Sequence, residues 1–128
     1  MNPKAVGELS EISTLQRLIV LGWSPSVPFG NNQRYDVVVE RDDKLYKCQV
    51  KTGRIKNGVV QAKAVSMAGG KTIRSYQGEI DVFLVWCPDN SKLYWVPIEH
   101  SNKKNIYLRL TPAKIKNELA LKAQDFEV

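Results

Sequence analysis

The chain has 128 residues and a formal net charge of +6, and no apolar run is long enough to cross a membrane. This length is typical of one domain with a single core, and it is too short for separate catalytic and recognition domains. Cys48 and Cys87 lie far apart inside predicted strands. They are therefore expected as buried free thiols of an intracellular, reducing compartment, the cytoplasm, and they give no zinc signature.

The first predicted element is a helix over residues 4–21, which ends at Gly22. Its apolar stripe, expected to pack on a sheet, consists of Ala5, Leu9, Ile12, Leu15 and Ile19. Glu8 lies within this stripe and Glu11 at its edge. A carboxylate on a buried face is costly unless it is paired or bound to a metal, so either glutamate is a candidate ligand. The alternatives are a residue at the rim of the interface for Glu11 and a fraying first-turn acid favoured by the helix dipole for Glu8.

A predicted β-hairpin follows the helix. The segments in chain order are an extended stretch, a loop and two strands, at residues 23–28, 29–33, 34–40 and 44–51. Folding the two strands together brings Asp36 near Gln49 and Lys51, which share one face by period-2 alternation. An acid, an amide oxygen and a lysine at the end of a hairpin can hold Mg²⁺ against a phosphate. The alternative for Lys51 is an ordinary surface lysine at a strand end.

The remaining elements complete an α/β pattern. Residues 52–78 are rich in glycine, and only 59–67 is expected to be ordered, as a strand or a short helix. The following elements are a central apolar strand, its partner, an edge strand and a C-terminal helix, at residues 80–87, 92–98, 106–110 and 112–123. This order predicts an α/β fold with a mixed central sheet flanked by helices, in one domain of residues 1–128.

The positive charge is concentrated in residues 44–78, where eight lysines and arginines occur without an acid. Such a cluster is typical of a surface that binds a phosphate backbone, and the alternative is a solvated basic surface. A second basic stretch beyond residue 103 is interrupted by Glu118 and carries less weight. The predicted contacts to such a backbone are Arg54, Lys56, Lys63, Lys71 and Arg74.

Four short motifs together resemble the PD-(D/E)XK nucleases: Gly7-Glu8-x-x-Glu11, Gly22-Trp23, Tyr35-Asp36 and Gln49-Val50-Lys51-Thr52. The closest likeness is to the small branch that includes group I intron homing endonucleases of the cyanobacterial type. Two positions depart from the usual pattern. Tyr35 stands where proline is common, and Gln49 stands where most members have Glu or Asp, a variant known in this branch. Glutamine can still offer its carbonyl oxygen to a hard cation, but it brings no charge.

The resemblance implies a restriction-endonuclease-like fold and site-specific cleavage of double-stranded DNA that depends on Mg²⁺, with Mn²⁺ as a substitute. Asp36 would bridge the metal and the scissile phosphate, and Lys51 would orient the attacking water. The implied catalytic residues are Asp36, Gln49, Lys51 and Glu11, and the implied metal ligands are Asp36, Gln49, the carbonyl of Val50, and Glu11 or Glu8.

Other functions stay open at this point. A Holliday-junction resolvase or DNA repair nuclease could use the same fold, and a DNA-binding module could have lost catalysis at Gln49. An RNA-binding or RNA-cleaving domain is a weaker alternative. Cutting both strands needs two active sites and this chain offers one, so a homo-oligomer, either a dimer or a tetramer, is expected.

Overall fold

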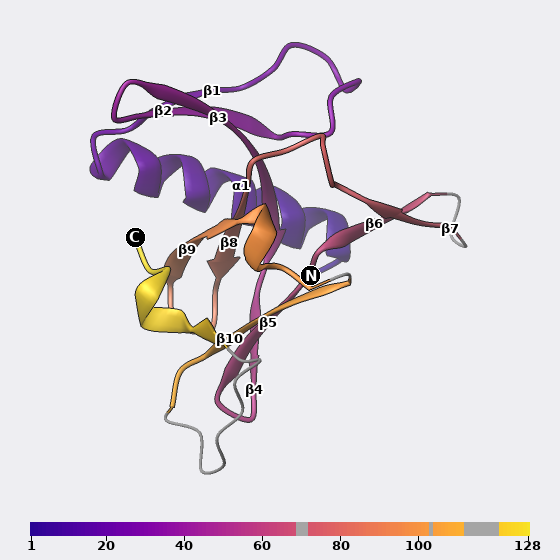
Figure 1. The fold of residues 1–128 in the computed structure, drawn as a ribbon, viewed down its shortest axis with the longest axis vertical. Helices are drawn as coiled ribbons and strands as arrows, with labels where there is room; N and C mark the ends of the chain where they lie inside the picture. Colours follow the sequence, from indigo (N-terminus) through magenta and orange to yellow (C-terminus); the bar gives the residue numbers. More distant parts are fainter. Residues whose placement is uncertain (69–71, 103, 112–120) are drawn as a thin grey trace.

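In a computed structural model, described for residues 1–68, 72–102, 104–111 and 121–128, one long helix and two β-sheets form three layers (Figure 1). One apolar core lies between the helix and the first sheet, and a second core lies between the two sheets. Cys48 and Cys87 are buried in these cores as free thiols, as predicted. Within the described part of the chain, no helix is long and apolar enough to span a membrane.

The first helix, α1 (Pro3–Val20), confirms the predicted element. Asn2 precedes it, and the Asn2 side chain accepts a hydrogen bond from the backbone N–H of Ala5 at 2.8 Å. Proline at the first helical position needs no intrahelical donor, and Gly22 follows the helix with a φ of +80°. Both ends therefore have the chemistry that the sequence indicated.

The predicted buried face of α1 is wrong. The fully buried residues are Ser10, Thr14 and Leu18, whereas Leu9, Ile12 and Ile19 of the expected stripe are exposed. The small Ser10 and Thr14 side chains let the helix approach the sheet closely, and Ser10 Oγ lies 2.6 Å from Thr52 Oγ1. Glu8 is exposed, so burial gives no reason for it to be a metal ligand.

The first sheet is mixed, with strand order β1-β2-β3-β8-β9. Its strands are β1 (Ser24–Ser26), β2 (Val37–Arg41), β3 (Lys44–Thr52), β8 (Val82–Cys87) and β9 (Lys92–Pro97). Within this sheet β3 and β8 pair in parallel, and the other neighbouring strands pair antiparallel. The predicted hairpin and the two later strands are confirmed, and the apolar β8 lies inside the sheet as its composition indicated.

A second sheet covers the face of the first sheet opposite α1, with strand order β11-β10-β5-β4. Its strands are β4 (Arg54–Lys56), β5 (Val59–Lys63), β10 (Asn105–Arg109) and β11 (Leu121–Lys122). Asn57 and Gly58 join β4 to β5 with positive φ values of 53° and 74°. An Asn-Gly pair is a strong hairpin signal, which the sequence analysis did not use.

The sequence predictions in this region have different outcomes. The ordered piece at 59–67 is strand, one of the two expected alternatives, and it is divided between β5 and β6 (Val65–Ala68). Further strands at residues 54–56 and 72–75 correct the expectation that only this piece is ordered. The expected edge strand, β10, lies between β5 and β11 and is therefore not an edge strand. Residues 112–120 of the expected C-terminal helix lie outside the described residues, and 121–123 form β11 and the start of a 3-10 helix, η2 (Ala123–Asp125). Among the described residues, a helix thus flanks the central sheet on one face only.

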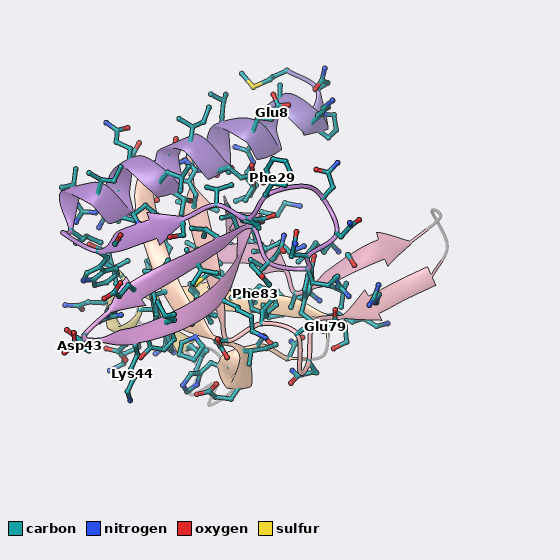
Figure 2. All side chains as sticks on the ribbon, turned by 90° about the horizontal axis from the view of Figure 1, so that it is seen from above. Glu8, Phe29, Asp43, Lys44, Glu79 and Phe83 are labelled. Atoms are coloured by element: carbon teal, nitrogen blue, oxygen red, sulfur yellow. The ribbon has the colours of Figure 1, made fainter. Side chains whose placement is uncertain are left out.

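A two-stranded ribbon, β6 with β7 (Thr72–Ser75), projects from the body of the molecule (Figures 1 and 2). The turn between β2 and β3, which carries Asp43 and Lys44, lies at the opposite end of the molecule in both views. The ribbon begins directly after the second sheet, because a single residue, Ala64, separates β5 from β6. Its first residue, Val65, accepts a hydrogen bond from Lys51, so the ribbon starts beside the strand that carries the predicted catalytic residues.

Candidate functional site

The candidate site lies where the β2–β3 ladder ends. The last paired residues are Val37 and Cys48, and Asp36 N–H donates to the carbonyl of Cys48 at 2.8 Å. Beyond this point the Asp36 carboxylate replaces a neighbouring strand, since Asp36 Oδ2 accepts the backbone N–H of Val50 at 2.9 Å. The N–H and C=O of a strand residue point to the same side, so the Val50 carbonyl faces the same gap.

Asp36 is held in an environment that disfavours its charge. Burial raises its pKa above 3.8, and the Val50 N–H and the Lys51 ammonium only partly oppose this effect. A carboxylate that has lost its water, and whose charge nearby groups only partly stabilise, is therefore stabilised when a cation binds beside it.

Glu11 is the helix acid that the structure brings into electrostatic contact with Asp36. Its side chain is exposed to solvent, yet surrounding protein removes enough water to raise its pKa above 4.5. The charges of Asp36 and Glu8 raise this pKa further. Glu8 lies nearly one turn earlier, exposed near the N-terminal end of α1 (Figure 2). Of the two predicted helix ligands, Glu11 is therefore the one coupled to Asp36.

Gln49 and the Val50 carbonyl add neutral oxygen atoms. The Gln49 amide nitrogen lies 3.4 Å from the Val50 carbonyl oxygen, and a half-turn of this amide would present its oxygen there instead. Among the described residues, no three His, Cys, Asp or Glu side chains form a metal-binding group. A metal at this site would consequently need the amide and carbonyl oxygens, which are ligands that hard divalent cations accept.

Lys51 is fixed by two neutral acceptors. Its ammonium group donates to the Val65 carbonyl and to the Tyr76 hydroxyl, both at 3.2 Å, and lies 4.8 Å from the centre of the Tyr76 ring. Neither contact neutralises the charge. The lysine is thus held in place as a cation, next to the carboxylate end of the site.

Arg34 and Tyr76 belong to this site although neither was among the predicted site residues. The Arg34 guanidinium stacks 4.0 Å from the Tyr76 ring centre, on a tyrosine that is itself buried. Arg34 also donates to the carbonyl of Ser75, to Ser66 Oγ and to Glu79 Oε1, at 3.2, 3.0 and 3.0 Å. These bonds tie the chain just before Asp36 to the base of the ribbon. The signal available for Arg34 was its position two residues before Asp36.

The predicted DNA contacts are dispersed. Arg54 pairs with Asp89 at 3.3 Å, and Arg74 pairs with Glu79 at 3.3 Å, so acids that lie beyond the basic segment in the sequence pair with two of its arginines. Lys56 and Lys63 are exposed on the second sheet, and Lys71 lies outside the described residues. The segment 44–78 therefore carries less unpaired positive charge than its sequence indicates.

A family model described as PD-(D/E)XK endonuclease matches residues 1–128. The chain belongs to the PD-(D/E)XK endonuclease family. The solved structure of a bacterial homing endonuclease, I-Ssp6803I, matches with a TM-score of 0.78 and 20% sequence identity, over 99% of this chain and 89% of that chain. A comparison with curated proteins gave no match. The family resemblance read from the motifs is thus confirmed, and the fold of this PD-(D/E)XK protein is that of the homing endonuclease.

Proposed function

We propose that this protein is a metal-dependent, site-specific endonuclease that cleaves double-stranded DNA in the manner of a homing endonuclease. Membership in the family implies hydrolysis of phosphodiester bonds. The observation that carries the finer proposal is the edge of β3 beyond the end of β2, where the Asp36 carboxylate accepts the Val50 N–H and lies close enough to the Lys51 ammonium for that charge to act on its pKa. The likeness to I-Ssp6803I supports DNA as the substrate.

The oxygen atoms at this gap fit a divalent cation, which PD-(D/E)XK nucleases typically use. Asp36, Gln49 and the carbonyl of Val50 would hold Mg²⁺, with Glu11 as the fourth protein group. Mn²⁺ would substitute, because it accepts the same hard oxygen ligands. Bound there, the metal would lower the pKa of the attacking water and screen the charge of the phosphate.

The residues of the chain supply positioning and a fixed charge. Asp36 holds its carboxylate toward the gap through the Val50 N–H, and Lys51 places a cation where negative charge develops on the phosphate. Because Val65 and Tyr76 accept hydrogen bonds from Lys51 without neutralising it, the lysine enters the reaction already oriented.

The test is a cleavage assay with Mg²⁺ on linear duplexes and on four-way junctions. Lys51→Ala should lower the cleavage rate by about 10²–10³-fold, while binding in Ca²⁺ changes little. Lys47→Ala is a matched control, since Lys47 is an exposed lysine four residues earlier on the same strand and face. Equal cleavage by wild type and Lys51→Ala would contradict the proposed mechanism.

Two alternatives have distinct outcomes in this assay. Preferential cutting of junctions over linear duplex would indicate a resolvase or repair nuclease. A protein that binds duplex but shows no thermal stabilisation by Mg²⁺ or Ca²⁺ would be a DNA-binding module without catalysis. Gln49 is the position where that loss would have occurred, because it removes one charge from the usual ligand set.

The proposal includes a homo-oligomer, a dimer or a tetramer, because cutting both strands requires two active sites. The exposed Leu9, Ile12 and Ile19 side chains of α1 form an apolar surface suited to a second copy of the chain. Light scattering after gel filtration should give at least twice the monomer mass, and Ile12→Glu should reduce it. A monomeric wild type that still cuts both strands would contradict this part.

A further inference from the structure

The second sheet has one buried face and one face turned to solvent. The register of β4, β5 and β10 separates their side chains by alternation. Val60, Ala62, Ile106 and Leu108 point into the core between the two sheets. The alternate side chains form what we call the outer face, which is built from three rows of paired residues.

Lys63 and Asn105 form the first row of the outer face. Arg54, Gln61 and Tyr107 form the second row. Successive rows are about 6.6 Å apart, because same-face residues are two positions apart along a strand.

The third row carries Lys56 and Arg109, which lie on either side of Val59, and Lys122 of β11 pairs next to Arg109. Each of the three rows thus contains at least one cation, and among the described strand residues of this sheet none is acidic. The one acid paired with these cations in the described residues is Asp89, which contacts Arg54 at the edge. Charge is therefore spread across the sheet and not collected at one point.

Polar and aromatic side chains lie between the cations. Tyr107 is 38% exposed in the middle row, and its neighbour Gln61 is half-buried. A tyrosine on the solvent side of a sheet, flanked by amides and cations, suits contact with sugars and phosphates. This pattern differs from an ordinary solvated sheet face, where both signs of charge are mixed.

The outer face belongs to strands that adjoin the candidate active site. Only Thr52 and Gly53 separate Lys51 from β4, and a Cβ on Gly53 would lie 2.8 Å from side-chain atoms of Val60 and Val85. The chain therefore passes tightly from one sheet to the other. The last residue of β5, Lys63, lies two residues before Val65, whose carbonyl accepts a hydrogen bond from Lys51. The first row thus lies on the strand end nearest the predicted catalytic lysine.

We propose that the outer face of the second sheet binds the sugar-phosphate backbone of duplex DNA beside the cleavage position. The inference rests on the proposed function, and it adds Gln61, Asn105, Tyr107 and Arg109 to the expected contacts. A two-fold contact with a second copy through this face is disfavoured, because it would bring two sets of cations together. The polyanionic backbone of a duplex has the complementary charge along its length.

The experiment measures binding of a short DNA duplex of arbitrary sequence in Ca²⁺, over a range of salt concentrations. The test variant is the double substitution Lys56→Gln and Arg109→Gln. The control is Lys44→Gln with Lys47→Gln, which removes the same charge from exposed lysines on β3, and the turn beside Lys44 lies at the end of the molecule opposite the β6–β7 ribbon (Figure 2). Circular dichroism and thermal unfolding verify that each variant is folded.

The outer-face variant should bind about tenfold more weakly at moderate salt, and the slope of log K against log [salt] should fall by about 1.8, for two lost phosphate contacts. Tyr107→Ala should weaken binding severalfold with the slope unchanged, because it removes no charge. If the outer-face variant and its control show the same affinity and slope, the proposal is overturned.

The result separates this inference from the proposed function. If wild type cleaves DNA and the outer-face variant binds DNA as its control does, the proposed binding surface is wrong. The proposed endonuclease function then still stands. Salt-dependent binding through this face, together with no cleavage of any member of a library of randomised duplexes in Mg²⁺ or Mn²⁺, would support the surface and contradict the nuclease. Tighter binding of an RNA duplex than of the DNA duplex would overturn DNA as the ligand.

Discussion

Asp36 and Lys51 lie at the same end of one hairpin, yet the surroundings of Asp36 disfavour its charge and those of Lys51 stabilise its charge. Asp36 has a pKa raised by burial, and Glu11 has a pKa raised by burial and by the charges of Asp36 and Glu8. Lys51, by contrast, donates to a carbonyl and a hydroxyl that stabilise its positive charge. The acidic half of the site is electrostatically strained, and the basic half is satisfied.

This difference indicates how the work is divided. A strained pair of carboxylates binds a cation more favourably than a relaxed pair would, because the cation relieves their repulsion. A lysine already fixed by neutral acceptors loses little conformational freedom when it meets a phosphate. Each half can be perturbed separately, with different readouts.

The largest effect is expected from Asp36→Asn. The cleavage rate should fall by about 10³-fold, because the carboxylate that would bridge metal and phosphate is gone. Without metal, however, the variant should melt at a higher temperature than wild type, since a neutral amide removes the repulsion with Glu11 and still accepts the Val50 N–H. The melting temperature without Ca²⁺ measures the gain in metal-free stability. Its increase on addition of Ca²⁺ measures how much stabilisation by the metal is lost.

Glu8→Gln is the matched control for this substitution, because it removes the same charge from an exposed position on α1. It should retain most of the cleavage and of the Ca²⁺ stabilisation. If Glu8→Gln and Asp36→Asn lose metal binding equally, the assignment of Glu11 over Glu8 as the helix ligand is wrong.

The second prediction concerns pH. Cleavage should decline as pH falls through the raised pKa values of Asp36 and Glu11, by up to about a hundredfold per unit once both carboxylates take up protons. The stability of the metal-free protein should change in the opposite sense. In the window between the unfolded and the folded pKa values, the native state binds more protons than the unfolded state. Its free energy of unfolding therefore falls as pH rises through that window.

The pH dependence of the cleavage rate in Mg²⁺ tests the first prediction. The pH dependence of urea unfolding in EDTA tests the second on the same protein. A metal-free stability that increases over this window would mean that the two acids are stabilised and not strained. The proposed contrast between strained carboxylates and a stabilised lysine would then be wrong for the carboxylates.

Tyr76→Phe addresses the basic half, with a smaller expected effect of about tenfold in cleavage rate. The phenyl ring keeps its edge contact with Phe83 and its stacking with Arg34, and only the hydroxyl that accepts from Lys51 is lost. One charge-assisted hydrogen bond corresponds to this magnitude. DNA binding in Ca²⁺ should be unchanged, so the loss should appear in kcat and not in KM.

A purely structural role for Tyr76 predicts a different pattern, with lower thermal stability and weaker binding at an unchanged kcat. Phe83→Leu provides the comparison, because it disturbs the ring packing of Tyr76 and leaves the hydroxyl of Tyr76 in the chain. Similar kinetics in the two variants would indicate packing and not the hydrogen bond to Lys51.

Local patterns in the sequence were sufficient to predict the hairpin and its residues. The alternation of β3 determines that Gln49 and Lys51 share a face, and the pairing of β2 with β3 determines that Asp36 lies opposite. These relations depend on neighbours within a few residues and one short turn. The first helix and the strands β8 and β9 were predictable for the same reason.

The rest depends on contacts between distant segments. Arg34 meets Tyr76 and Glu79 across more than 40 residues, and no spacing within the chain indicates such a contact. The second sheet forms because β10 returns to pair with β5, which turns a glycine-rich segment into ordered strands. The buried side of α1 was mispredicted because close approach to the sheet favours the small Ser10 and Thr14 over larger apolar residues.

The smallest predicted effect tests that helix face directly. Ser10→Ala removes the buried hydrogen bond to Thr52 and should lower the free energy of unfolding by about 1 kcal/mol. Ile12→Ala should cost less than about 0.5 kcal/mol, because this side chain is 62% exposed. A buried isoleucine would instead cost about 2–5 kcal/mol. Urea unfolding at several protein concentrations distinguishes folding from assembly, since only loss of an oligomer contact makes the cost of Ile12→Ala depend on concentration. A large, concentration-independent cost at Ile12 would restore the apolar stripe read from the sequence.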